Sequence, residues 1–178
     1  MIDIYTFIEA IWLMWPAYGA NGLCMLARGK RPIDGGRVFR NKPVFGPGKT
    51  WEGLVLGVIV AILVATFQMF VYPYLPWDLS PVLLDIVPMS PFLGLVIGLG
   101  AMVGDLGGSL VKRRIGIARG KPAPLLDQLD FIIGMLIFAS FVIALKWEWI
   151  VILLVLTPVL HLIANGIAYL LKLKKVPW

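Results

Sequence analysis

Three aspartates in the second half of the sequence lie at positions where a carboxylate can do chemistry. Asp105 lies seven residues before Lys112 inside an apolar stretch, which is about 10 Å along a helix. A carboxylate at such depth is costly and marks a candidate functional site. Asp127 and Asp130 are three residues apart, so a helix presents both on one face. Helix capping explains one aspartate, but not a pair with a third carboxylate in the preceding apolar segment.

Basic residues surround these aspartates in two segments rich in glycine and proline. The first segment contains seven bases and the second contains five: Arg28, Lys30, Arg31, Arg37, Arg40, Lys42 and Lys49, then Lys112, Arg113, Arg114, Arg119 and Lys121. Topology signals that touch anionic headgroups require fewer bases than this. Mg²⁺ prefers one or two carboxylates together with phosphates and water, and bases neutralise the remaining phosphate charge. The pattern predicts a magnesium–phosphate site with Asp105, Asp127 and Asp130 as metal ligands.

Two glycine motifs lie next to these residues. The run Gly48-Lys49-Thr50 ends like a phosphate-binding P-loop, but that motif needs a glycine where Pro43 stands, and no strand precedes it. We therefore predict only a phosphate contact there. Around Asp105, the small residues of 104–109 allow either close helix packing or room for a metal or phosphate. The sequence leaves both of these readings open.

The composition of the chain excludes most soluble classes. The chain has 178 residues, of which 60% are hydrophobic and only 15% are charged, and its mean hydropathy is +0.89. An ordinary soluble domain is about a quarter charged, so a soluble enzyme, a disordered tail and a coiled coil are all excluded. The single cysteine, Cys24, excludes an internal disulfide framework and a cysteine-based zinc site. The composition is that of a small membrane protein.

The apolar runs predict an all-α integral membrane fold with five spanning helices in a single polytopic domain, residues 1–178. A span needs about 20 mostly apolar residues, and runs of this kind cover approximately residues 4–27, 53–77, 86–111, 129–146 and 149–171. Two charged loops, 28–52 and 112–128, connect them. The first run has neither a basic leader nor a cleavage site, so we expect it to be a span rather than a removable signal. His161 and Asn165 share a face of the fifth run, where an interhelical hydrogen bond is expected.

Lysine and arginine accumulate on the cytoplasmic side of membrane proteins, and they set the orientation here. Five spans place both charged loops and the basic tail on the same face, with Lys172, Lys174 and Lys175 in the tail. Only Lys146 of the 16 bases remains on the other face. We therefore predict that the N-terminus lies outside and the C-terminus in the cytoplasm. The active site is expected at the cytoplasmic face of the cell membrane.

The sequence closely resembles the CDP-archaeol synthase family, the archaeal relatives of bacterial CDP-diacylglycerol synthase. The signature lies in residues 104–114, Gly-Asp-Leu-Gly-Gly-Ser-Leu-Val-Lys-Arg-Arg, followed by 127–131, Asp-Gln-Leu-Asp-Phe. Three further stretches, 16–21, 31–36 and 45–53, resemble the family in the same order. The chain departs from the bacterial pattern at Ala118-Arg119, at Gln128 and in lacking a glycine-histidine loop.

This resemblance implies a membrane enzyme that transfers CMP from CTP to the phosphate of 2,3-di-O-geranylgeranylglycerol phosphate. It implies Mg²⁺ as cofactor and Asp105, Asp127, Asp130, Lys49 and Arg113 as catalytic residues. The substrate-binding residues that we expect, with Asn21 facing Asp105 and Ser109 orienting it, are Lys42, Lys49, Gly46, Gly48, Thr50, Arg113, Lys121, Ser109 and Asn21. Arg37 and Arg114 are weaker candidates.

Three other functions would each use part of this pattern. A small transporter or channel would use Asp105 as an ion-coupling carboxylate, and polar residues through the full membrane depth, such as Glu9, would support it. A non-catalytic lipid-binding scaffold would need the bases but not three converging acids. The aspartate pattern of CDP-alcohol phosphotransferases is missing. No nucleic-acid partner is expected, and a homodimer is left open.

Overall fold

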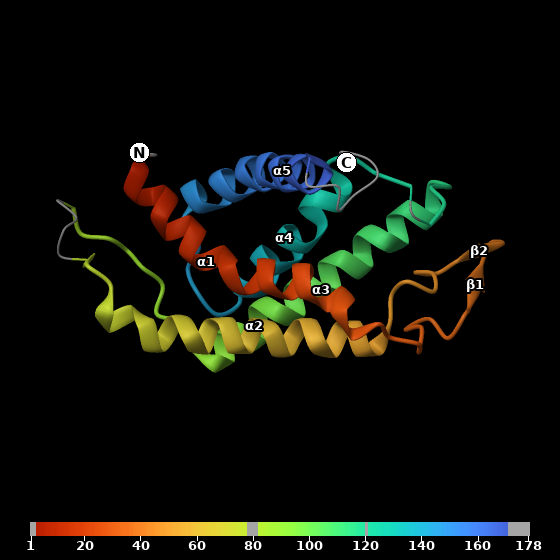
Figure 1. Ribbon diagram of the computed structural model, residues 1–178, viewed down its shortest axis with the longest axis horizontal. Helices are drawn as coiled ribbons and strands as arrows, with labels where there is room; N and C mark the ends of the chain where they lie inside the picture. Colours follow the sequence, from red (N-terminus) through yellow and green to blue (C-terminus); the bar gives the residue numbers. More distant parts are fainter. Residues whose placement is uncertain (1–2, 78–81, 120, 171–178) are drawn as a thin grey trace.

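Five long α-helices make up most of the part of the chain that the structure describes (Figure 1). This computed structural model describes residues 3–77, 82–119 and 121–170, apart from the side chains of residues 164, 165, 167 and 168. The helices are α1 Ile4–Leu23, α2 Trp51–Val71, α3 Pro91–Arg114, α4 Leu126–Ala139 and α5 Trp147–Leu170. Two short 3₁₀ helices, η1 Cys24–Ala27 and η2 Tyr72–Tyr74, extend α1 and α2, and a hairpin pairs β1 Val38–Phe39 with β2 Lys42–Pro43. The expected all-helical class and the count of five helices agree with this architecture.

The helix bounds differ from the expected spans at several ends. Helix α3 begins at Pro91 rather than at residue 86, because the Ser90 hydroxyl caps it by accepting from the Leu93 amide at 3.1 Å. Proline at the first helical position suits this start. At its other end α3 continues through Arg114, so the prediction that residues 112–114 belong to a loop was wrong. The basic side chains of this turn project from a helix, which fixes their directions.

The fourth helix is short and shifted toward the preceding loop. Helix α4 has 14 residues, which rise about 21 Å. It begins at Leu126 and ends at Ala139, whereas the sequence predicted 129–146. Asp127 and Gln128 therefore lie in its first turn rather than in the loop, and residues 140–146 form turns and irregular chain. Residue 171 of the fifth expected span, the basic tail and the Asn165 side chain lie outside the described part of the chain.

Glycines allow α3 and α4 to approach closely. A Cβ added at Gly104 would collide with the Asp130 carbonyl group, and one at Gly134 would collide with the Gly100 carbonyl. At Gly108 an added Cβ would overlap the Asp130 carboxylate. In this structure Gly104 serves close helix packing, while Gly108 leaves the space that the Asp130 side chain fills. The crossing of α3 and α4 thus sets where that carboxylate lies.

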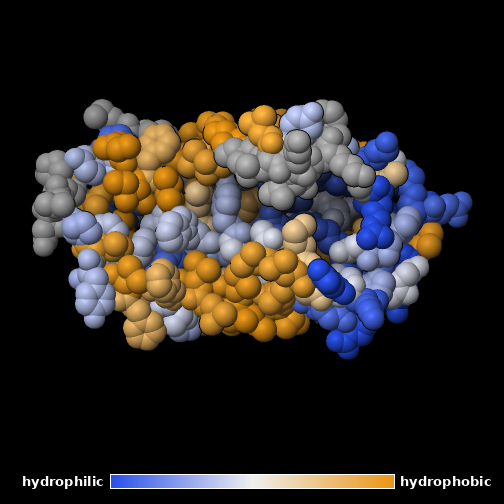
Figure 2. Space-filling view, in the orientation of Figure 1, coloured by the Kyte–Doolittle hydropathy of each residue, from blue (hydrophilic) through white to orange (hydrophobic). Residues whose placement is uncertain are grey.

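A broad apolar surface covers the middle of the molecule, and hydrophilic side chains gather at the end that carries the hairpin (Figure 2). The exposed apolar side chains of α2 contribute to it: Val55, Ile59, Leu63, Phe67 and Phe70. Among the described residues, two segments, Trp51–Tyr74 and Pro91–Arg114, are long and apolar enough to cross a membrane, and Trp147–Ile163 is a shorter apolar helix.

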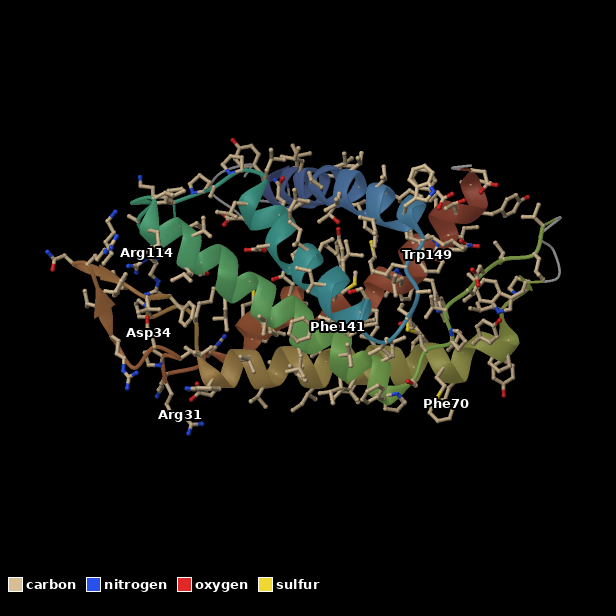
Figure 3. All side chains as sticks on the ribbon, turned by 180° about the vertical axis from the view of Figure 1, so that it is seen from behind. Arg31, Asp34, Phe70, Arg114, Phe141 and Trp149 are labelled. Atoms are coloured by element: carbon tan, nitrogen blue, oxygen red, sulfur yellow. The ribbon has the colours of Figure 1, made fainter. Side chains whose placement is uncertain are left out.

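The end opposite the hairpin is held by a buried carboxylate. Glu9 is 5% exposed; it accepts hydrogen bonds from the Asp85 amide at 2.6 Å, the Trp149 indole at 2.8 Å and Lys146 Nζ at 2.9 Å. Lys146 also pairs with the Asp85 carboxylate at 3.2 Å. Figure 3 shows Trp149 at this end and Asp34 and Arg114 at the other. Glu9 therefore ties α1 to α5 far from the aspartates of α3 and α4.

Candidate active site

Asp34 folds the first basic loop, residues 28–50, around its own carboxylate. One carboxylate oxygen accepts from the Gly36 amide at 3.0 Å, and the other accepts from the Phe45 and Gly46 amides at 3.0 and 2.8 Å. Burial alone would raise the pKa of this carboxyl, but the backbone donors outweigh it and hold the pKa below its ordinary value. Gly46 adopts a φ of +93°, which glycine reaches without strain. The loop can therefore turn back toward the helices.

Arg114 fixes the hairpin to the end of α3. Its guanidinium donates to the carbonyls of Phe39 at 2.7 Å, Lys42 at 3.3 Å and Pro43 at 2.5 Å. The Lys42 ammonium donates in return to the Arg114 carbonyl at 3.1 Å. The Arg114 guanidinium therefore stabilises the hairpin rather than offering its hydrogen bonds to a substrate. These contacts also hold Lys42 beside a smaller cavity that neighbours the site, together with Arg113 and Gly116.

The three predicted aspartates line one cavity of about 300 Å³, which we call the aspartate cavity. Its wall consists of Phe45, Gly46, Gly48, Lys49, Asp105, Ser109, Lys112, Arg113, Arg119, Asp127 and Asp130. A second cavity of about 380 Å³, the α1–α2 cavity, shares four of these residues and extends to Asn21, Thr50 and Arg28. Asn21 and Asp105 both line the second cavity, and a direct contact between them stays a prediction.

Two of the aspartates form ion pairs with lysines of the same cavity. Lys49 Nζ lies 2.5 Å from Asp105 Oδ2 and 2.6 Å from Asp105 Oδ1. Lys112 Nζ lies 2.7 Å from Asp127 Oδ1. The other Asp127 oxygen accepts from the Ala123 amide at 2.9 Å, so this residue also shapes the turn before α4. Asp130 accepts from the Phe131 amide at 2.7 Å and forms no ion pair with any other described residue.

Within the described residues, no three acidic, histidine or cysteine side chains are arranged as a ready-made metal cluster. The donor set nevertheless fits a hard cation, because three carboxylates reach one polar cavity and oxygen ligands are what Mg²⁺ prefers. A Cβ at Gly108 would take the space of the Asp130 carboxylate. The residues therefore fit magnesium, provided that Lys49 and Lys112 leave Asp105 and Asp127.

The other predicted binding residues differ in whether their hydrogen-bond donors are available to a substrate. The Gly46 amide donates its hydrogen bond to Asp34, so it is not available to a phosphate. The Thr50 hydroxyl caps α2 by accepting from the Gly53 amide at 3.2 Å, which leaves its own proton for donation. Gly48 lines both cavities. Lys121 is exposed and lines neither cavity.

Comparison with known proteins gives the family. The profile of the CarS-like family, described as CDP-archaeol synthase, matches residues 1–178. The chain belongs to the CDP-archaeol synthase family. Relatives of this name are 42% identical in Thermococcus onnurineus, over 99% of this chain and 100% of theirs, and 43% identical in Haloarcula marismortui, over 100% of both.

A solved structure agrees with this assignment. An intramembrane enzyme for archaeal membrane lipid biosynthesis matches with a TM-score of 0.75 and 37% identity, covering 89% of this chain and 93% of that one. The chain is therefore a membrane enzyme of lipid biosynthesis with the cytidylyltransferase activity of its family.

The structure of this CDP-archaeol synthase family member adds Arg119, which the sequence analysis counted among the bases of the second loop but did not name as a site residue. Arg119 lines the aspartate cavity, the α1–α2 cavity and the smaller neighbouring cavity. Its guanidinium faces Gly48, where an added Cβ would lie 3.5 Å from Nε. Arg113, by contrast, donates to the carbonyls of Phe45 and Ile117. The departure at Ala118-Arg119 from the bacterial pattern was the signal that could have drawn attention to it.

Proposed function

We propose that this protein transfers CMP from CTP to the phosphate of 2,3-di-O-geranylgeranylglycerol phosphate, giving CDP-archaeol and pyrophosphate. The observation that carries the proposal is the aspartate cavity, where Asp105, Asp127 and Asp130 meet Lys49, Arg113 and Arg119. Family membership supplies the reaction class. A cavity lined by acidic and basic residues at one end of an apolar helical bundle can receive a nucleotide from the water and a lipid phosphate from the bilayer.

The reaction needs little acid–base chemistry from the protein. A phosphate monoester has a second pKa of about 6, so the lipid phosphate is already largely a dianion at neutral pH. Its oxygen forms a bond to the α-phosphorus of CTP, the bond between the α- and β-phosphates breaks, and the electron pair leaves with pyrophosphate. The protein must then align the two phosphates and neutralise their charge.

Asp105, Asp127 and Asp130 would hold Mg²⁺ in this proposal. When bound, the cation would neutralise phosphate charge and orient the reacting groups. Lys49 and Arg113 would bind the triphosphate, with Arg119 closing on it from the loop side of Gly48. Gly48 and Thr50 would add hydrogen bonds, and Asn21 and Ser109 would line the two cavities. Lys42 and Lys121 would contribute positive charge from outside the aspartate cavity.

Lys49 and Lys112 would change partners when CTP arrives. In the absence of substrate they neutralise Asp105 and Asp127 at 2.5 and 2.7 Å. An incoming polyphosphate offers the ammonium groups more negative charge than a single carboxylate does. As the lysines turn to the phosphates, their carboxylates become free for a cation. Nucleotide and metal would therefore bind more tightly together than either does alone.

We further propose a multi-pass placement with the site at the cytoplasmic face. The bases gather at the hairpin end, whereas Lys146 at the other end is paired with Glu9 and Asp85. This asymmetry follows the positive-inside rule and supports an outside N-terminus, a cytoplasmic C-terminus and one membrane domain over residues 1–178. The same pairing gives Glu9 a structural role, so it no longer supports the transporter hypothesis.

The test is pyrophosphate release from purified protein in detergent, with CTP, Mg²⁺ and 2,3-di-O-geranylgeranylglycerol phosphate. We expect release that depends on the lipid and stops when EDTA removes the metal. Release without the lipid would contradict the proposed role of the lipid as acceptor, and release in excess EDTA would contradict the proposed role of the metal. No release from folded protein that binds CTP would overturn the proposed reaction.

A further inference from the structure

The α1–α2 cavity and the aspartate cavity meet along a shared wall. The residues that line both cavities are Gly48, Lys49, Asp105 and Arg119. Two reacting groups must approach to about 3–3.5 Å before a bond between them can form. If each cavity receives one substrate, the two reacting phosphates must therefore meet at this wall.

The two cavities differ in their charged residues. Three carboxylates line the aspartate cavity, whereas Asp105 is the only carboxylate among the described residues of the α1–α2 cavity. Lys49 already neutralises Asp105 at 2.5 Å. Within the described residues, Arg28 is the one base that lines the α1–α2 cavity but not the aspartate cavity. The α1–α2 cavity is therefore the better place for an anion that brings no metal with it.

Arg28 has a backbone conformation that is unfavourable for arginine. It follows η1 with a φ of +45° and a ψ of +40°, in the left-handed region, where the Cβ of an ordinary L-residue comes too close to the carbonyl oxygen. Glycine reaches this conformation without strain. Residues held in such sparsely populated regions gather at functional sites, which indicates a use for the Arg28 side chain.

The Arg28 guanidinium has no partner within the described part of the protein. It forms neither a hydrogen bond nor an ion pair there. The nearby Arg31 shows the alternative, because its Nε lies 2.8 Å from Glu52 Oε1. Arg28 is exposed and lines the α1–α2 cavity, so it lies where that cavity opens. Its donors are available to a ligand.

The surroundings of Arg28 place it at the depth of the lipid phosphates. Leu23, Met25 and Leu26, just before it, are 45%, 76% and 65% exposed, on a segment that packs against the first turn of α2 (Figure 1). Helix α2 is long and apolar enough to cross a membrane, and it begins at Trp51, which is 49% exposed. Exposed tryptophans gather at the membrane interface. Exposed apolar side chains next to an arginine are typical of a segment at this depth.

We propose that the α1–α2 cavity receives the phosphate of the lipid substrate and that Arg28 binds this phosphate. A phosphate dianion accepts the two parallel hydrogen bonds that a guanidinium offers. The lipid enters past the apolar side chains of η1, and its phosphate oxygen forms the bond to the α-phosphorus of CTP at the shared wall as pyrophosphate leaves. The nucleotide occupies the aspartate cavity. This inference rests on the proposed function, whose lipid acceptor it locates.

The first experiment removes the Arg28 charge and compares it with a matched arginine. Arg40 also has a left-handed φ, of +50°, and lines neither cavity. In detergent without anionic lipid, we expect Arg28→Gln to raise the KM for the isoprenoid lipid phosphate by about tenfold or more, the scale of a lost charged hydrogen bond. The KM for CTP should be unchanged. Arg28→Lys keeps the charge but not the paired donors, so its lipid KM should rise less, and Arg40→Gln should change neither KM.

Equal lipid KM values in Arg28→Gln and Arg40→Gln would overturn the assignment. A KM for CTP that rises as much as the lipid KM would also overturn it, because the nucleotide would then occupy the α1–α2 cavity. Without anionic headgroups in the detergent, a base that serves only membrane topology would produce no KM effect. If wild-type protein releases no pyrophosphate, the proposed function fails; if it does and Arg28→Gln matches it, only this inference fails.

The second experiment separates substrate binding from folding. Arg28→Gly removes the side chain and relieves the left-handed backbone, so we expect an unchanged or higher Tm together with the raised lipid KM of Arg28→Gln. Arg40→Gly makes the same backbone change and should leave both KM values unaltered. A lower Tm in Arg28→Gly together with a wild-type lipid KM would show that the Arg28 side chain stabilises the fold instead of binding substrate.

Discussion

Lys49 Nζ lies 2.5 Å from Asp105 Oδ2, across 56 residues of sequence and between the first basic loop and α3. The Lys49 side chain is 28% exposed and that of Asp105 is 17% exposed, so solvent screens the pair only partly. The ion pair connects a nucleotide-binding candidate to a metal-binding candidate. In the proposed function, the substrate and the cation would compete with a contact that already exists within the protein.

Removing the Lys49 charge should therefore uncouple metal and nucleotide binding. In wild-type protein we expect Mn²⁺ to bind weakly alone and about tenfold more tightly with CTP, within the usual range of coupling. Lys49→Met should strengthen Mn²⁺ binding without CTP, weaken CTP binding and reduce the coupling factor. Electron paramagnetic resonance of Mn²⁺ with and without CTP measures these values, and no lipid is needed.

A matched control for this charge change is Lys30→Met, at an exposed position that lines neither cavity of the site. Lys112→Met tests the second pair in the same way through Asp127. If Mn²⁺ affinity without CTP is the same in Lys49→Met, Lys30→Met and wild-type protein, the exchange of partners does not occur.

Asp127→Asn and Asp130→Asn should each abolish turnover while the protein stays folded. The change keeps the size of the side chain but removes a charge that we assign to the metal. Initial rates of pyrophosphate release, with helix content from circular dichroism, measure both effects. Asp3→Asn is the control, because asparagine also caps helices and Asp3 caps α1. A wild-type rate in either variant would remove the metal-site argument.

Arg119→Gln should raise the KM for CTP by about tenfold or more, since hydrogen bonds to charged groups are worth about 1.5–3 kcal/mol. The lipid KM should change little, because Arg119 lies on the loop between α3 and α4, where its guanidinium faces Gly48 of the first basic loop. Steady-state kinetics with each substrate varied in turn separates the two. Arg40→Gln, at the hairpin turn, should leave both KM values unchanged. An unaltered KM for CTP in Arg119→Gln would place that guanidinium outside the site.

Acid should loosen the first basic loop through Asp34. Because three amides hold its pKa below the ordinary 3.8, the carboxylate contributes its full stabilisation above the unfolded pKa of about 3.9. That contribution is lost as pH falls through the lower folded pKa. Hydrogen exchange of the Phe45 and Gly46 amides from pH 5 to 2.5 should show protection falling at the acid end.

Asp34→Asn supplies the comparison for this pH dependence. An asparagine cannot accept with both side-chain atoms, so one set of loop amides loses its acceptor at every pH. We expect lower protection at pH 5 and little further change on acidification. Protection that is equal in the variant and the wild type at pH 5 would show that Asp34 does not organise the loop.

Lys146→Met should lower stability without affecting the chemistry. The buried Glu9 carboxylate would lose one of its three donors, at a cost of about 1–3 kcal/mol. The cluster lies at the end of the molecule opposite Asp34 and Arg114 (Figure 3). A thermal shift assay should show a lower Tm, and kcat and both KM values of the folded protein should match the wild type. A changed kcat would mean that the two ends are coupled.

The sequence by itself determined the helical membrane fold and the positions of most site candidates. Its apolar runs are long and its charges are few. The number of helices therefore follows from the number of runs that are long enough to cross a bilayer. Asp127 and Asp130 are three residues apart, so helix periodicity alone predicts that they share one helix face. The resemblance of residues 104–114 to the family supplied the reaction, which the family match supports over the whole chain.

The tertiary structure decided which of these groups are free and which are already in use. The Arg114 guanidinium donates to the hairpin and the Gly46 amide donates to Asp34. Arg119, by contrast, lines the aspartate cavity. Local spacing cannot predict this, because each of these contacts joins segments that are far apart in sequence or meet only after the loops fold. The position of Asp130 depends likewise on Gly104, where an added Cβ would meet the Asp130 backbone, and on Gly108, where it would meet the Asp130 side chain.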